Sequence, residues 1–185
     1  MGGGPQIGRE TRYSHRLIVM EEKTLNALRW IVDILDSHEI PYRIGGGFAA
    51  HVYGSTRPVN DIDISLSGTF FPIIMPEVAA YVSAELKHYS GEKWDCDGFS
   101  LDYHGQEIDI SDIDTLRMSD LELTKWFQTK DHFRMFPSVL TNVDGIEVSL
   151  IDPHDLVAYK RHLADRDYQL IDIAAVQKYI ADHTL

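Results

Sequence analysis

The chain is short of cysteine, of long apolar segments and of paired metal-binding histidines. Its one cysteine, Cys96, can form neither an internal disulfide nor a thiolate metal cluster, so we interpret it as a plain thiol. None of the nine histidines falls in an HExxH-like pair. No apolar run approaches the roughly 20 residues that cross a bilayer, and the N-terminus lacks the charged and apolar regions of a secretory signal. We therefore expect a cytoplasmic protein without a membrane segment.

Basic residues are also scarce, and none are gathered in a run. The sequence has 29 acidic and 17 basic residues, which gives a formal net charge of −12. Proteins that bind long nucleic acids rely largely on basic side chains to displace counterions. The charge balance therefore argues against a polynucleotide partner and accommodates a small, cationic one more easily.

The length and composition fit one globular domain. The 185 residues are 44% hydrophobic and 25% charged, which is ordinary usage for a chain that buries a core. Residues 1–14 have no periodic pattern, and we expect them to be a disordered arm or an expression remnant. Residues 15–185 are expected to form the domain, with a helical C-terminal part over about 153–185.

Hydrophobic periodicity predicts a mixture of helices and strands. Apolar residues at helical spacing predict helices over 20–38, 48–53 and 77–87, and two more after residue 152. Period-two alternation predicts strands over 42–44 and 61–66, and hairpins over 99–111 and 138–151.

Two aspartates in the predicted strand over 61–66 are separated by a single residue. Successive side chains of a strand point to opposite faces, so Asp61 and Asp63 share one face while Ile62 and Ile64 enter the core. Neighbouring carboxylates repel each other unless a cation neutralises them. Mg²⁺ prefers carboxylate oxygens and often takes further ligands from substrate phosphates. The pair therefore indicates a metal site whose partner carries phosphate.

Three glycines, Gly45, Gly46 and Gly47, precede this pair in the sequence. They lie between a predicted strand and a predicted short helix. Without Cβ atoms, such a segment can bring backbone N–H groups close to an anion. A glycine cluster alone is more often a plain turn, but its combination with the aspartates favours a phosphate cradle.

Chemistry with two metal ions needs a third carboxylate, as a metal ligand or as a base. The run "GQEIDISD" offers Asp109 on a strand whose Ile108 and Ile110 face the core. If this strand pairs beside the Asp61 strand, the three carboxylates converge. Three other acidic residues compete for the role, namely Glu107, Asp112 and Asp114.

The segment "IGGGFAAHVYGSTRPVNDIDISL" resembles the glycine and D-x-D motifs of the DNA polymerase β-like nucleotidyltransferase superfamily. It is most similar to the small single-domain type found in lincosamide and aminoglycoside nucleotidyltransferases and in AbiE-type toxin proteins. The matching positions are Gly46, Gly47, Ala49, Gly54, Arg57, Asp61 and Asp63. The resemblance implies an α/β (α+β) fold, with a mixed sheet flanked by helices and a helical C-terminal segment.

The implied reaction moves a nucleoside monophosphate from an NTP to a hydroxyl and releases pyrophosphate. Asp61 and Asp63 would hold Mg²⁺ on the triphosphate, and Asp109 would complete a two-metal site or act as base. Arg57 would contact phosphate, although it is as readily a surface residue. The usual Gly-Ser of the broader superfamily is Gly-Gly here, so backbone N–H groups would have to replace the serine hydroxyl.

The tail "DPHDLVAYKRHLADRDYQLIDI" resembles the helical ending of these small transferases more loosely. It makes Lys160 a candidate triphosphate contact or a solvated helix lysine, and Asp172 a structural or site-edge residue.

Three functions remain open from the sequence. The first is nucleotidyl transfer to a small hydroxylated acceptor such as an antibiotic, the second is toxin-like transfer to tRNA or protein, and the third is a nucleotide-binding module without catalysis. Trp94, Trp126 and Phe127 could line an acceptor cleft or belong to the core. A homodimer with a shared cleft also stays open.

Overall fold

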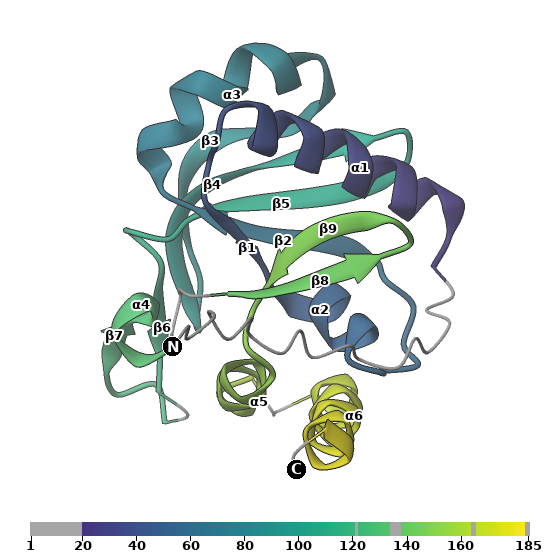
Figure 1. Ribbon diagram of the computed structural model, residues 1–185. Coiled ribbons are helices and arrows are strands. Elements are labelled where there is room, and N and C mark those ends of the chain that lie inside the picture. Colours follow the sequence, from purple (N-terminus) through teal and green to yellow (C-terminus); the bar gives the residue numbers. More distant parts are fainter. Residues whose placement is uncertain (1–19, 121, 134–137, 164–165, 184–185) are drawn as a thin grey trace, which may run out of the picture.

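The computed structural model describes residues 20–120, 122–133, 138–163 and 166–183 (Figure 1). The arm predicted over residues 1–14 lies outside this part, so the division into an arm and one domain stays a prediction. Within the described residues, no helix combines the length and the apolar character that crossing a membrane requires.

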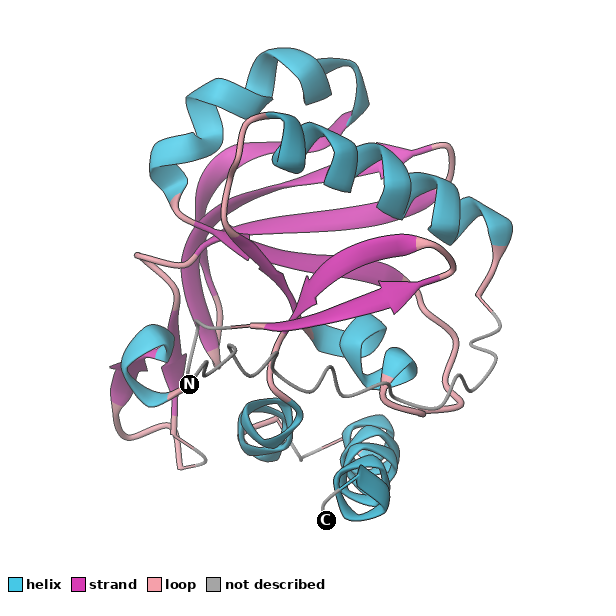
Figure 2. Ribbon diagram, in the orientation of Figure 1, coloured by secondary structure: helices cyan, strands magenta, loops and turns pink. Residues whose placement is uncertain are grey.

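The chain combines helices with runs of consecutive strands in an α+β arrangement (Figure 2). The helices are α1 (Glu22–Ser37), α2 (Gly46–Val52), α3 (Phe71–Val78), α4 (Thr129–His132), α5 (Pro153–Arg161) and α6 (Asp167–His183), with 3-10 turns at Gly68–Phe70 and Ala79–Tyr81. The strands are β1 (Tyr42–Ile44), β2 (Asp61–Leu66), β3 (Val82–Ser90), β4 (Trp94–Tyr103), β5 (Gln106–Asp112), β6 (Arg117–Ser119), β7 (Trp126–Gln128), β8 (Val139–Val143) and β9 (Ile146–Leu150).

The described strands form one mixed sheet. Its order is β7-β6-β4-β5-β2-β1-β9-β8, and β3 pairs with β4 outside this path. The pairs β2–β5 and β1–β9 are parallel, whereas the other pairs are antiparallel. The predicted fold class, a mixed sheet flanked by helices with a helical C-terminal segment, is confirmed.

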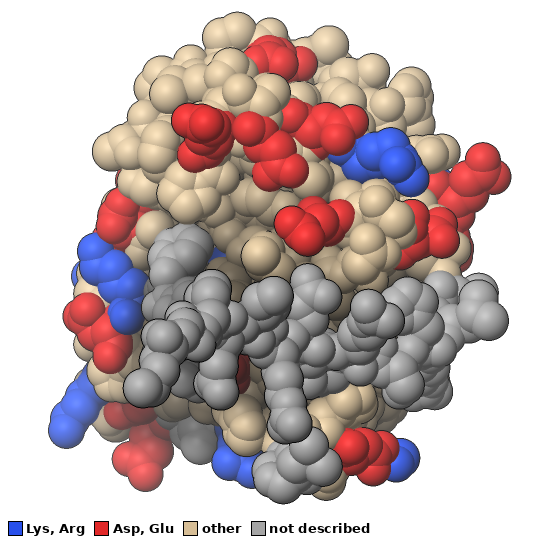
Figure 3. Space-filling model, in the orientation of Figure 1, with Lys and Arg blue, Asp and Glu red and all other residues tan. Residues whose placement is uncertain are grey.

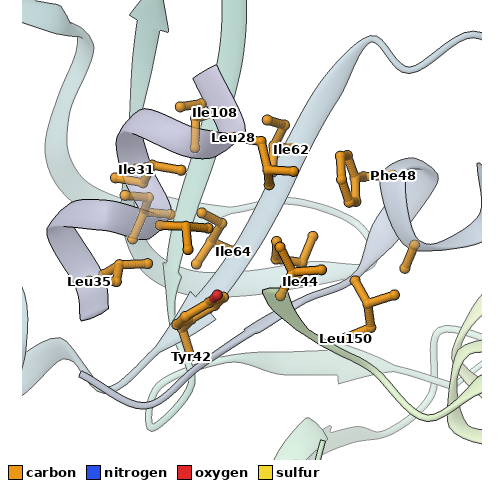
Figure 4. Close-up of a cluster of buried hydrophobic side chains, with 14 of the residues drawn as sticks. Leu28, Ile31, Leu35, Tyr42, Ile44, Phe48, Ile62, Ile64, Ile108 and Leu150 are labelled. Carbon is orange, nitrogen blue, oxygen red and sulfur yellow. The ribbon is translucent and has the colours of Figure 1, made fainter. Parts of the chain in front are cut away.

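The core lies where α1 packs against the sheet, as Figure 4 shows. Leu28, Ile31 and Leu35 from α1 are fully buried there. They meet Ile62 and Ile64 of β2, the side chains that the strand alternation assigned to the interior. Because one face of β2 is committed to this core, its aspartates must lie on the other face.

Both predicted hairpins are present, and their turns have the expected backbone. Asp144 and Gly145, which join β8 to β9, both have positive φ angles, of 49° and 84°. His104 and Gly105, which join β4 to β5, have φ angles of 52° and 85°. Two-residue turns of this kind match the twist of the flanking strands, which fixes the register of the hairpins.

One element was predicted wrongly: residues 77–87 do not form a helix. Pro76 lies inside α3, which ends at Val78, and β3 begins at Val82. The outer edge of the long strand β4 presents backbone N–H and C=O groups, and β3 satisfies them by antiparallel pairing. This pairing outweighs the local helical spacing of the apolar residues, because strand formation depends more on tertiary context than on propensity.

Candidate active site

Three aspartates converge on the sheet face opposite α1. Oxygen atoms of Asp61, Asp63 and Asp109 lie within 4.8 Å of one another, and all three side chains are partly exposed. The convergence follows from strand pairing, because β2 and β5 run parallel with Asp63 directly beside Asp109. Their alternate neighbours Ile62, Ile64, Ile108 and Ile110 are buried on the core face. We call these aspartates the carboxylate triad.

The triad is electrostatically unfavourable without a cation. Burial, together with the charges of Asp61 and Asp109, raises the pKa of Asp63 to about 7. Burial and the Asp109 charge likewise raise the pKa of Asp61 above its usual range. The nearby Lys160 ammonium opposes both shifts without abolishing them. Groups held in this way bind protons or metal ions more readily than isolated carboxylates do.

The glycine segment makes room for the triad. Gly46 has a φ angle of +56°, and a Cβ atom at this position would lie 1.5 Å from Asp63 Oδ2. The Gly45 N–H donates to the Asp63 carbonyl oxygen at 2.9 Å, and the Gly47 N–H donates to the Asp63 carboxylate. The short helix predicted over 48–53 in fact begins at Gly46, so the glycines form its cap and first turn. In this structure the glycines contact Asp63 directly, and Gly46 and Gly47 also line the cleft.

The third carboxylate is Asp109 rather than one of its competitors. The Ser100 hydroxyl on the neighbouring strand donates to Asp109 Oδ1 at 2.5 Å, and the two residues are paired in register. Asp112 instead accepts the Gly68 N–H at 2.8 Å, and Asp114 pairs with Lys130. Glu107 lies on the same face as Asp109 but outside the triad.

A cleft of about 780 Å³ opens beside the triad. Of the sequence candidates, Gly46, Gly47, Arg57, Asp61, Asp63, Trp94 and Lys160 line it. Trp94 contacts the ring of Tyr159 on α5, with centroids 5.4 Å apart. Trp126 and Phe127 lie on β7 and are not among the lining residues, and Phe127 contacts His132 and His162 instead. Only Trp94 therefore fits the predicted acceptor cleft.

Four basic residues line the cleft, namely Arg57, Lys93, Lys160 and Arg166, and two of them share one buried carboxylate. Arg57 Nη1 and Lys160 Nζ both donate to Asp172 Oδ2, at 2.5 and 2.8 Å. The Ser55 hydroxyl donates to the other carboxylate oxygen at 2.6 Å, and Gln169 accepts from Lys160 at 3.1 Å. Lys160 is thus no solvated surface lysine, and Asp172 ties α6 to both cations.

The donor chemistry of the triad fits a divalent cation. Three carboxylates contribute hard oxygen ligands from one sheet face, and their partial exposure leaves room for water or phosphate oxygens. Mg²⁺ typically uses one or two protein carboxylates together with such outside ligands. The residues present therefore suit Mg²⁺.

Comparisons with known proteins give structural matches only. No family model matches the chain, and no curated protein matches its sequence. A candidate nucleotidyltransferase from Thermotoga maritima is similar over 89% of this chain and 97% of its own, with a TM-score of 0.63 and 17% identity. The chain therefore has a nucleotidyltransferase fold.

Two antibiotic-resistance proteins share this nucleotidyltransferase fold. The lincosamide antibiotic adenylyltransferase LnuA, solved with lincomycin bound, matches over 86% of this chain and 98% of its own, with a TM-score of 0.58 and 16% identity. The antibiotic-resistance factor ANT(2'')-Ia matches over 89% of this chain and 86% of its own, with a TM-score of 0.57 and 15% identity. The resemblance to this superfamily stated from the motifs is confirmed at the level of the fold.

Several residues at the site escaped the sequence analysis, among them Ser55, Tyr159 and Gln169. Tyr159 and Gln169 line the cleft on the helical side of this nucleotidyltransferase fold, and Ser55 holds Asp172 from behind. Tyr159 directly precedes Lys160 in the sequence, and this proximity was a weak signal that Tyr159 also lines the cleft. Ser55 and Gln169 carried no recognisable pattern, because only the packing of α6 brings them to Asp172.

Proposed function

We propose that the protein is a Mg²⁺-dependent nucleotidyltransferase that moves a nucleoside monophosphate from an NTP to a hydroxyl of a small acceptor. The observation that carries the proposal is the carboxylate triad, of which Asp61 and Asp63 line one cleft together with the cations Arg57 and Lys160. Crowded carboxylates suit a metal ion, and buried cations suit phosphate. An Mg-NTP complex offers both in one ligand.

In the proposed reaction, the acceptor hydroxyl oxygen bonds to the α-phosphorus of the NTP. The bond from this phosphorus to the oxygen that bridges to the β-phosphate breaks, and pyrophosphate leaves with that electron pair. The hydroxyl proton passes to Asp109 or, if Asp109 is a metal ligand, to solvent. Bound Mg²⁺ would neutralise charge on the phosphates and on Asp61 and Asp63.

The proposed roles of the other residues follow from their positions. Arg57 and Lys160 bind the β- and γ-phosphates and offset the charge that builds on pyrophosphate as it leaves. Gly45, Gly46 and Gly47 keep Asp63 in place, and the backbone of Gly46 and Gly47, which lines the cleft, approaches the triphosphate closely.

The acceptor binds beside Trp94 and Tyr159, whose rings line the cleft together. Such aromatic walls suit a compact molecule with an apolar or planar face. The antibiotic-modifying neighbours support a small acceptor. On the face drawn in Figure 3, basic side chains lie singly or in small groups among acidic ones, which offers little to a polynucleotide.

Pyrophosphate release tests the proposal. Each of the four NTPs is offered with Mg²⁺ and with one of three acceptor sets: pooled aminoglycosides, pooled lincosamides or total tRNA. The active-site variant is Asp61→Asn, and its matched control is Asp33→Asn, which alters an exposed aspartate of α1 on the other side of the sheet.

We expect release with one small-molecule set, lost without Mg²⁺ and reduced by about three orders of magnitude in Asp61→Asn, but kept in Asp33→Asn. Release only with tRNA would replace the small acceptor by the toxin-like alternative. Binding of Mg-NTP without release from any set would favour a nucleotide-binding module.

A further inference from the structure

Asp172 is a fully buried carboxylate that contacts two cations of the cleft wall, Arg57 and Lys160. One of its oxygens accepts hydrogen bonds from both Arg57 and Lys160, at 2.5 and 2.8 Å, while the other accepts the Ser55 hydroxyl at 2.6 Å. These partners come from the segment before β2 and from α5, whereas Asp172 itself belongs to α6. Three separate parts of the chain therefore meet at one carboxylate.

The charges in this cluster do not balance. Asp172 is fully buried, the Lys160 side chain is 3% exposed, and the Arg57 side chain is 22% exposed. Two cations share one carboxylate, so the cluster keeps an excess positive charge at the cleft. Holding two buried cations this close is unfavourable unless an anion joins them.

The excess charge faces the triad. Arg57 and Lys160 line the same cleft as Asp61 and Asp63. When a divalent cation neutralises the triad, the carboxylates no longer compensate the two cations. A polyphosphate chain bound to that metal ion would then be the anion that completes the cluster.

We infer that Asp172 is a positioning residue that presents Arg57 and Lys160 as a preformed pair to the triphosphate chain. This inference rests on the proposed function. Long basic side chains lose considerable rotamer freedom when a ligand fixes them, and a partner that fixes them beforehand removes this cost from binding.

A double-mutant cycle tests the inference with inorganic tripolyphosphate as the probe, which avoids any choice of base or acceptor. Binding of tripolyphosphate in the presence of Mg²⁺ is measured by calorimetry for the wild type, Asp172→Asn, Lys160→Met and the double variant. Asp182→Asn is the matched control, because Asp182 also lies on α6 and pairs with a lysine, but at the surface.

We expect Asp172→Asn and Lys160→Met each to weaken binding by about 10- to 100-fold. The loss in the double variant should be clearly smaller than the two single losses combined, because Asp172 acts partly through Lys160 and partly through Arg57. Asp182→Asn should bind like the wild type. In transfer assays, Asp172→Asn should raise KM for the NTP and leave KM for the acceptor unchanged, which a merely structural defect would not do.

Ser55→Ala and Gln169→Met keep the inference testable if Asp172→Asn does not fold. Each loosens the cluster without removing a charge, and each should weaken tripolyphosphate binding by about threefold or more. Binding by all variants at the wild-type affinity, or strictly additive losses in the cycle, would overturn the role of Asp172 and leave the proposed function standing. A wild type that does not bind tripolyphosphate with Mg²⁺ would overturn both.

Discussion

Two charged clusters lie beside the cleft, one around Asp172 and the other the carboxylate triad, and they solve the problem of buried charge in opposite ways. Asp172 is surrounded by its own partners, Arg57, Lys160 and Ser55. The carboxylate triad instead sets like charges together, and burial together with these charges raises the pKa of Asp63 to about 7. The difference indicates that the protein itself supplies the counter-charges of Asp172, whereas the counter-charge of the triad is left to a ligand.

The largest expected effect is on the free energy of unfolding, which should respond differently when a carboxylate is neutralised in each of the two clusters. Asp172→Asn should lower the free energy of unfolding by about 3 to 5 kcal/mol, because it leaves buried cations without their counter-charge. Asp63→Asn should leave it unchanged or raise it, because it relieves repulsion. Urea unfolding with a chelator present measures both variants, and a similar loss in both would remove the distinction between the clusters.

A glycine substitution sharpens the comparison by disturbing the triad alone. Gly46→Ala should lower the free energy of unfolding by about 1 to 3 kcal/mol and weaken metal binding, because its Cβ would overlap the Asp63 carboxylate. Gly105→Ala is the control, since Gly105 also has a positive φ angle but nothing within 4 Å of the added Cβ. Mn²⁺ titration followed by electron paramagnetic resonance should show weakened binding for Gly46→Ala alone.

The carboxylate triad should also make the stability of the fold depend on pH. The pKa of Asp63 is raised from 3.8 to about 7, so between these values the folded chain binds more protons than the unfolded chain. The free energy of unfolding without metal should therefore fall as the pH rises from about 4 to about 7, by on the order of 2 kcal/mol after allowance for solvent screening.

The difference between the wild type and Asp63→Asn isolates this contribution from other titrating groups. Adding Mg²⁺ at pH 7.5 should restore stability to the wild type only. If the free energy of unfolding changes with pH in the same way in the two proteins, the pKa of Asp63 is not raised as its surroundings suggest.

The smallest expected effect concerns the internal support that the triad does have. Ser100→Ala should lower the rate of nucleotidyl transfer by about tenfold and leave KM for the NTP unchanged, because the Ser100 hydroxyl orients Asp109. Ser100→Thr should retain activity. Ser111→Ala is the control on the neighbouring strand, since Ser111 bonds with Ser65 rather than with a carboxylate. A loss of rate in Ser111→Ala as well would point to general loosening of the sheet.

The sequence allowed the triad to be predicted more fully than the cation cluster. Period-two alternation placed Asp61 and Asp63 on one face of a strand, and the isoleucines around Asp109 did the same for its strand. The partners of Asp172 are 115 and 117 positions away in Arg57 and Ser55, a separation that no local pattern spans. The wrong helix over 77–87 has the same origin, because pairing with β4 decides the conformation of that segment.

The parallel pairings have a consequence for how the protein folds. β2 pairs with β5 across an intervening hairpin, and β1 pairs with β9 across most of the described chain. Closing such long loops costs entropy before any contact repays it, so we expect folding on the millisecond-to-second timescale that is typical of high contact order. The triad exists only after β2 and β5 have docked. The capture of a divalent ion by the triad would therefore report when the sheet closes during refolding, so that the candidate metal site also serves as a kinetic probe.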